Sequence, residues 1–128
     1  MREIDIYQVD AFTDVPFGGN PAGVVPDASG LSEDTMQKIA REMNLSETAF
    51  VVDTRGKGPA DFDVRFFTPL NEVDLCGHAT IGAFWLLAET GVIPPGKNEV
   101  RVTQSTGAGV LPVDIVFGCE GTPARVMM

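Results

Sequence analysis

The sequence is poor in the residues that build disulfide frameworks and metal sites. It has two cysteines, Cys76 and Cys119, and one histidine, His78, in 128 residues. Two cysteines are too few for a disulfide framework, and no C-x-x-C motif or Cys/His cluster offers a set of metal ligands. We therefore expect a protein of the reducing cytoplasm that holds no metal and no other cofactor.

Basic residues and long apolar runs are also scarce. Nine Lys and Arg against eighteen Asp and Glu give a formal net charge of −9, so most of the surface should repel nucleic acids and anionic membranes. The first residues form no apolar signal segment, and the longest apolar run, residues 83–88, is far too short to span a membrane. Neither a nucleic-acid partner nor a membrane is expected, and a small anionic substrate would need a locally positive pocket.

The overall composition, 44% hydrophobic and 21% charged, is typical of one globular domain. Ser32 resembles a helix N-cap, and the helical spacing of apolar residues after it predicts an amphipathic helix over residues 33–43. Strands are expected within the segments 4–12, 24–25, 45–52, 62–66, 100–103, 110–117 and 123–128. This pattern predicts an α+β fold, in which a curved, mainly antiparallel sheet surrounds one apolar helix and the second helix lies outside.

A polar, glycine-marked stretch at residues 74–82 leads directly into the apolar run 83–88. Such a sequence predicts the N-terminus of a buried helix, where unpaired N–H groups and the helix dipole favour a carboxylate or phosphate. Gly77 has no side chain to keep an anion away, and Cys76 and His78 beside it can exchange protons. The alternative is structural, with His78 as a helix cap and Cys76 as a small buried hydrophobe.

Glu47 lies near the start of the strand expected at residues 45–52. By period-two alternation it shares a face with Ala49 and Val51, while Thr48 and Phe50 lie opposite. Because neither face is polar, a carboxylate at the mouth of this strand would be partly desolvated and able to take and give a proton. A glutamate at the solvated end of a strand is the alternative.

Three regions in order along the chain resemble one family. They comprise residues 10–13 (DAFT) with 16–24 (PFGGNPAGV), residues 42–51 (EMNLSETAFV), and residues 65–69 (RFFTP) with 72–83 (EVDLCGHATIGA). Together they are similar to the phenazine biosynthesis isomerase (PhzF-like) family, whose relatives include diaminopimelate epimerase. The similarity spans essentially the whole chain.

The resemblance implies a diaminopimelate epimerase-like fold of two similar lobes, with the active site in the cleft between them and no cofactor. It implies that Glu47, in the S-E-T motif, is the acid/base that moves a proton between carbons of a small cyclic or carboxylate-bearing substrate. Gly77 would contact this substrate through its backbone N–H, and His78 through a hydrogen bond. Asn20, in the glycine-rich loop, and Cys76 are further candidates for lining the site.

Family members are about twice as long as this chain, so we expect residues 1–128 to be a single lobe that corresponds to the N-terminal half. The missing partner would be a second lobe or a second copy in a homodimer. In epimerase and proline racemase relatives a cysteine before the glycine is a base, which makes a cysteine-dependent racemase or epimerase the first alternative. Cys119 is poorly placed to be the second thiol, so Cys76 is better interpreted as a packing residue. A non-catalytic binding or oligomerisation module is the remaining alternative.

Overall fold

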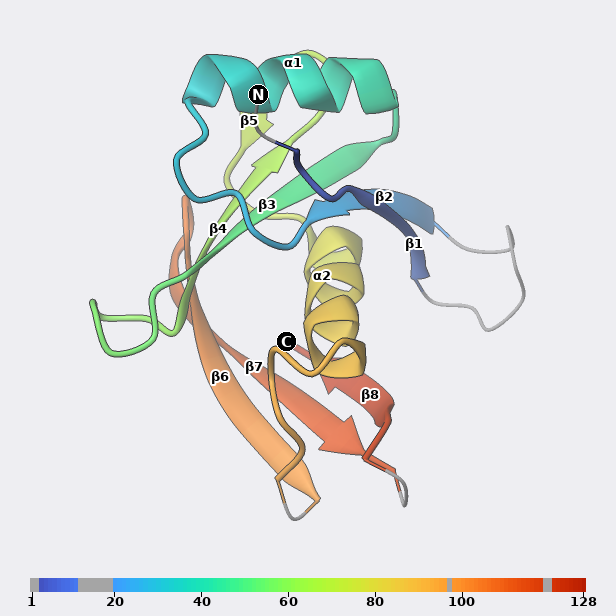
Figure 1. Ribbon diagram of the computed structural model, residues 1–128, viewed down its shortest axis with the longest axis vertical. Coiled ribbons are helices and arrows are strands. Elements are labelled where there is room, and N and C mark those ends of the chain that lie inside the picture. The colour runs from blue at the N-terminus through green and yellow to red at the C-terminus, as the bar shows by residue number, and fades with distance from the viewer. Residues whose placement is uncertain (1–2, 12–19, 97, 119–120) are drawn as a thin grey trace.

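The computed structural model describes residues 3–11, 20–96, 98–118 and 121–128 (Figure 1), with the side chains of Ala11 and Asn20 left out. Its elements in chain order are β1 (Tyr7–Ala11), β2 (Asn20–Val25), α1 (Glu33–Met43), β3 (Glu47–Asp53), β4 (Phe62–Phe67), β5 (Glu72–Val73), α2 (Gly77–Glu89), β6 (Glu99–Thr106), β7 (Gly109–Phe117) and β8 (Pro123–Met127). The expected α+β class is confirmed.

The strands form one curved sheet in the order β1-β2-β3-β4-β6-β7-β8, with β5 beside β4. The pairs β2–β3 and β4–β6 are parallel, and the other pairs of the described sheet are antiparallel. The sheet curls around α2, which contacts β1, β2 and β3 on one side and β7 and β8 on the other (Figure 1). The expected mainly antiparallel sheet around a central helix is therefore present, with two parallel joints.

Helix α1 has the expected limits because both of its ends are capped. The Ser32 hydroxyl accepts a hydrogen bond from the Thr35 N–H at 3.1 Å. At the other end, Asn44 adopts a left-handed conformation with φ 52°, which ends the helix. Met36 and Ala40 of α1 pack with Phe50 and Phe67 on the outer face of β3 and β4, so α1 is the outer helix.

Helix α2 is buried along most of its length, with Ala79, Ala83, Phe84 and Leu87 all at 0% exposure. A helix that is apolar on every side belongs inside a domain, and here the concave sheet provides that enclosure. Neither helix of the described residues has the length and hydropathy needed to cross a membrane.

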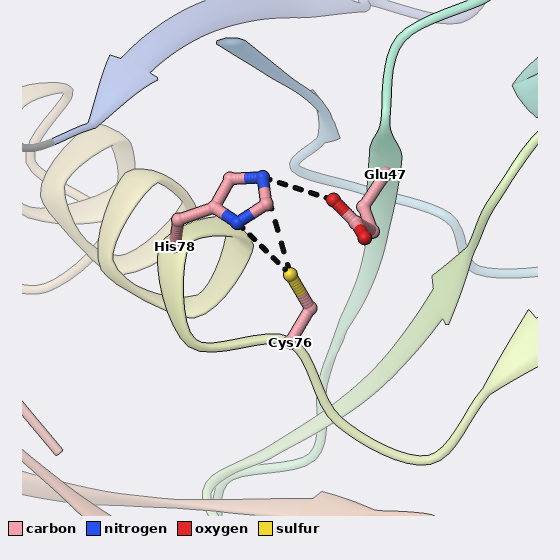
Figure 2. Close-up of side chains that lie close together, drawn as sticks. All are labelled: Glu47, Cys76 and His78. Atoms are coloured by element: carbon pink, nitrogen blue, oxygen red, sulfur yellow. Dashed lines mark hydrogen bonds and ion pairs between the residues drawn. The ribbon is translucent and has the colours of Figure 1, made fainter. Parts of the chain in front are cut away.

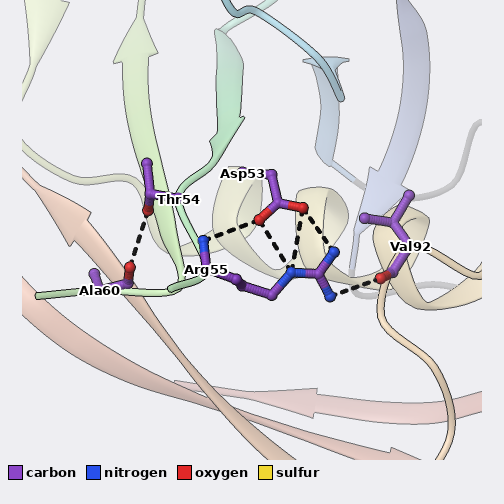
Figure 3. A network of polar contacts seen from close by, with 5 residues as sticks. All are labelled: Asp53, Thr54, Arg55, Ala60 and Val92. Carbon is purple, nitrogen blue, oxygen red and sulfur yellow. Dashed lines mark hydrogen bonds and ion pairs between the residues drawn. The ribbon is translucent and has the colours of Figure 1, made fainter. Parts of the chain in front are cut away.

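Arg55, in the loop between β3 and β4, ties that loop to the segment after α2 (Figure 3). Its guanidinium donates to the Asp53 carboxylate, with an Nη2–Oδ2 distance of 2.6 Å, and to the Val92 carbonyl at 3.0 Å. The Thr54 hydroxyl closes the same loop by donating to the Ala60 carbonyl at 2.9 Å. The Arg55 guanidinium also holds the pKa of Asp53 below its ordinary value. These contacts fix the loop against the C-terminal end of α2.

Close packing also fixes the segment before α2. A Cβ atom on Gly107, in the turn between β6 and β7, would lie 2.6 Å from Asp74 Oδ1 and 2.9 Å from Asp74 Cα. Only glycine allows this approach, so the β6–β7 turn supports the chain two residues before Cys76.

Candidate active site

The N-terminus of α2 and the first residue of β3 meet at one cluster of three side chains (Figure 2). The His78 ring lies between the Glu47 carboxylate and the Cys76 sulfur. His78 Nε2 is 2.9 Å from Glu47 Oε2, and His78 Nδ1 is 3.3 Å from Cys76 Sγ. The structure therefore brings together three predicted site residues from two distant segments of the chain.

The fold explains why these side chains converge. Ala49 and Val51 of β3 pack in the cluster that contains α2, whereas Phe50 packs with α1. Side chains alternate along a strand, so Glu47 shares the α2-facing side, as the alternation predicts. Parallel pairing of Glu47 with Ala22 of β2 fixes the position of Glu47 along the sheet, beside the N-terminus of α2.

Cys76 is the N-cap of α2, with an extended backbone (φ −140°, ψ 120°) and no capping hydrogen bond from its side chain. Gly77 and His78 follow as the first two residues of the helix. The expected position of His78 at the start of a buried helix is therefore confirmed, and its ring extends back toward the sheet.

The cluster is mostly shielded from water. The side chains of His78 and Glu47 are 17% and 20% exposed. Glu47 Oε2 is itself inaccessible and, within the described residues, has no hydrogen bond of good geometry. The 2.9 Å contact with His78 is thus a close polar contact that is imperfectly aligned.

The two neighbours of the His78 ring favour different roles for its two nitrogens. A carboxylate can only accept a hydrogen bond, so Glu47 favours a proton on Nε2. Nδ1 is then the acceptor, and the Cys76 thiol can donate to it. In this tautomer, close polar contacts run from the Cys76 sulfur through the His78 ring to the Glu47 carboxylate.

Burial raises the pKa of the Cys76 thiol, and the nearby negative charge of Glu47 adds to this effect. Backbone N–H groups of Ala79 and His78 act in the opposite direction without reversing it. The thiol is therefore protonated at neutral pH, which disfavours Cys76 as a resting base.

This shift gives a test by alkylation, because only the thiolate reacts with iodoacetamide. We expect Cys76 in the folded chain to react more slowly at neutral pH than in the urea-unfolded chain, and the difference to shrink as the pH rises through the raised pKa. Glu47→Gln removes the adjacent charge and should speed the reaction at a given pH. Peptide mass spectrometry separates Cys76 from Cys119. Equal rates in folded and unfolded chains at neutral pH would contradict this assignment.

Gly77 is exposed at the mouth of the cluster. A Cβ atom there would meet nothing closer than Met128 Sδ at 3.9 Å. Packing does not require glycine at this position, which is consistent with a ligand approaching the N–H groups of the first helical turn.

We therefore expect Gly77→Ala to fold normally and to bind small carboxylates less well. Alanine is the better helix former by up to about 1 kcal/mol, so the unfolding midpoint should be unchanged or slightly higher. Acetate binding, followed by NMR shifts of the amides of residues 77–79, should weaken. Gly58→Ala is the control, since a Cβ there also meets nothing within 4 Å. Equal acetate affinity in the two variants would exclude an anion seat at Gly77.

The structure describes the other predicted site residues only in part or not at all. The backbone of Asn20 begins β2, two residues before the partner of Glu47, but its side chain lies outside the described residues. Cys119 and residues 17–19 of the glycine-rich loop also lie outside them, whereas residues 20–23, predicted as the rest of that loop, are the first residues of β2.

Ser46, for which the sequence predicted no role, also lies beside the His78 ring. Its hydroxyl is 3.4 Å from His78 Nε2 and 3.4 Å from the Pro21 carbonyl oxygen. The only signal in the sequence was its place immediately before Glu47 in the S-E-T motif.

Comparison with known proteins places the chain among isomerase relatives. Residues 9–127 match the family described as phenazine biosynthesis-like protein (PhzC-PhzF). An uncharacterized isomerase of Clostridium acetobutylicum is 49% identical over 116 residues, covering 91% of this chain and 37% of that protein. An uncharacterized isomerase of Bacillus subtilis is 43% identical over 115 residues, again covering 37% of its length.

Solved structures agree with the fold. A PhzF-family phenazine biosynthesis protein of Bacillus anthracis has a TM-score of 0.82 and 41% identity, covering 96% of this chain and 39% of that chain. A probable proline racemase from Agrobacterium radiobacter, 16% identical with a TM-score of 0.72, shares the fold. The chain thus spans 37% to 39% of the length of the three family relatives compared.

Proposed function

The chain belongs to the phenazine biosynthesis-like (PhzC-PhzF) family, and we propose that it is one lobe of a cofactor-independent isomerase in which Glu47 moves a proton. The relatives named isomerases support the reaction class. The observation that carries the residue assignment is the placement of a shielded carboxylate beside His78 at the open end of α2, with Oε2 and Nε2 2.9 Å apart.

In the proposed reaction, the substrate carboxylate binds at the N–H groups of Gly77 and the first turn of α2. The positive end of the helix then stabilises the negative charge that develops when the adjacent carbon loses its proton. Glu47 accepts that proton, while the electron pair of the broken C–H bond is delocalised into the substrate. Glu47 returns the proton to another carbon, and His78 orients the carboxylate through Nε2.

Cys76 as a catalytic base is the second candidate, because its sulfur lies 3.3 Å from His78 Nδ1. In that reaction His78 would help to remove the thiol proton, and a cysteine-dependent racemase or epimerase would result. The raised pKa of the Cys76 thiol weighs against it, so Glu47 is the preferred base.

Gly77, at the N-terminus of α2, is exposed beside the cluster, and we propose that a second lobe or a second copy of this chain covers the site. The structure leaves Ile81 and Trp85 of α2 only partly buried, with apolar surface available to such a partner. Sedimentation equilibrium tests whether two copies associate, and a monomer at all concentrations would exclude the homodimer.

Solvent exchange tests the proposed function directly. The 128-residue chain is incubated in D2O with a panel of cyclic and carboxylate-bearing carbon acids, and NMR follows loss of substrate C–H signals. We expect exchange with at least one compound, either with the chain alone or with a second lobe from a longer relative supplied in trans. Absence of exchange across the panel under both conditions would contradict the proposal.

A further inference from the structure

We propose that Glu47, Cys76 and His78 form a zinc-binding site that leaves a fourth coordination position open. One potential ligand atom from each residue lies within 4.8 Å of the other two. Thiolate sulfur, imidazole nitrogen and carboxylate oxygen are the ligands that zinc takes in proteins, usually four in a tetrahedron. No local sequence motif reveals this set, because Glu47 and Cys76 belong to segments that only the fold brings together.

Two of the three ligand distances are close to those around a tetrahedral ion, and the third, from the Glu47 oxygen to Cys76 Sγ, is below 4.8 Å. Zinc bonds of about 2.0 to 2.3 Å require ligand atoms roughly 3.3 to 3.6 Å apart. His78 Nε2 is 2.9 Å from Glu47 Oε2 and 4.0 Å from Cys76 Sγ. Each of these two distances differs from the tetrahedral value by about half an ångström, which rotations of the side chains can supply without moving β3 or α2.

A second observation also points to a cation. Glu47 Oε2 is inaccessible to solvent and has no well-formed hydrogen bond within the described residues. A buried carboxylate oxygen in that state costs free energy unless a positive group or a donor satisfies it. An ion between Oε2, Nε2 and Sγ would do so, and a water or a ligand group would complete the open position.

Charge and proton balance favour zinc over harder ions. Binding breaks the S–H bond of Cys76 and releases its proton to solvent as the Zn–S bond forms, because a coordinating thiol is deprotonated. The imidazole proton moves from Nε2 to Nδ1, so that Nε2 is free to bind the ion. The two negative ligands then neutralise Zn²⁺. Magnesium and calcium prefer oxygen ligands, so neither should bind here. If Glu47 is the base of the proposed reaction, bound zinc would also inhibit it, although zinc binding itself does not depend on that function.

Zinc uptake by the metal-free 128-residue chain tests the site. Equilibrium dialysis against ZnCl₂, with elemental analysis, should give one zinc per wild-type chain and no bound magnesium. Cys76→Ala, His78→Asn and Glu47→Gln should each weaken binding, and the first two by at least about 100-fold, since even loss of residues that orient ligands costs 10- to 100-fold. Cys119→Ala, which changes the other cysteine, should bind like the wild type.

A second measurement uses the unmodified protein and so does not depend on how a variant folds. Zinc should protect Cys76 of the wild-type chain from iodoacetamide, as read by peptide mass spectrometry, and a chelator should restore alkylation. The proposal is overturned if the folded wild-type chain takes up no stoichiometric zinc. Zinc binding that survives all three single substitutions, or that depends on Cys119 and not on Cys76, would overturn it as well. None of these results depends on whether the chain exchanges substrate protons.

Discussion

Glu47→Gln is expected to lower the rate of solvent-proton exchange into substrate by about 10² to 10⁴, the usual contribution of a positioned acid/base group. Glutamine keeps the shape of the side chain but cannot accept the substrate proton. The mutant should keep its fold because Glu47 Oε2 makes no well-aligned hydrogen bond within the described residues that the fold would lose. Exchange rates by NMR in D2O, with substrate binding measured separately, give the comparison.

Glu42→Gln is the matched control for this substitution. Glu42 is exposed on α1 and precedes Glu47 by five positions, so the substitution removes the same charge away from the cluster. Its exchange rate should stay within about twofold of the wild type, since surface substitutions rarely disturb a fold. A wild-type exchange rate in Glu47→Gln would show that another group carries the proton.

Phe84→Ala should produce the largest loss of stability, about 3 to 5 kcal/mol in the free energy of unfolding. Phe84 lies in the centre of α2 at 0% exposure and packs edge-to-face on Phe62 with ring centroids 5.7 Å apart. Truncation removes buried apolar surface and leaves a cavity between α2 and the sheet. Urea unfolding followed by circular dichroism measures the change, and many domains of this size have only about 5 to 15 kcal/mol to lose.

Leu70→Ala provides the contrast, because Leu70 is 86% exposed. It should change the free energy of unfolding by no more than about 0.5 kcal/mol. If Phe84→Ala cost as little as Leu70→Ala, α2 could not be the centre of the core.

Much of this fold could be predicted because local signals and tertiary packing agree. Ser32 caps α1 as the pattern indicated, and the helix ends at Met43, the last residue of the predicted range. The apolar run after Gly77 forms the buried helix, and the alternation of β3 correctly placed Glu47 on the same face as Ala49. These features depend on helix caps and on periodicity, which neighbouring residues determine.

Features that depend on distant pairing were not predicted. Strand β5 is two residues long and exists through its pairing with β4, so it has no periodicity of its own. Strands β4 and β6 pair in parallel with Phe62 opposite Gln104. The sequence of neither strand alone predicts this register. The role of Gly107 likewise depends on Asp74 packing against it.

The candidate site was likewise predictable only in part. Resemblance to the family selected Glu47, Gly77 and His78, but the contact of Cys76 with the His78 ring and the approach of Ser46 to Nε2 required the folded chain. Three potential metal ligands from two separate segments are invisible to any motif, which is why the sequence predicted no metal site.

The most direct test compares Glu47→Gln with Cys76→Ser in one exchange assay, using the same substrate in D2O. If Glu47 is the base, Glu47→Gln should lower the exchange rate by a factor of about 10² to 10⁴. Cys76→Ser should stay within about tenfold of the wild-type rate, because a serine hydroxyl can still donate to His78 Nδ1. The opposite pattern, with exchange lost in Cys76→Ser and kept in Glu47→Gln, would contradict the assignment and make this lobe part of a cysteine-dependent racemase or epimerase.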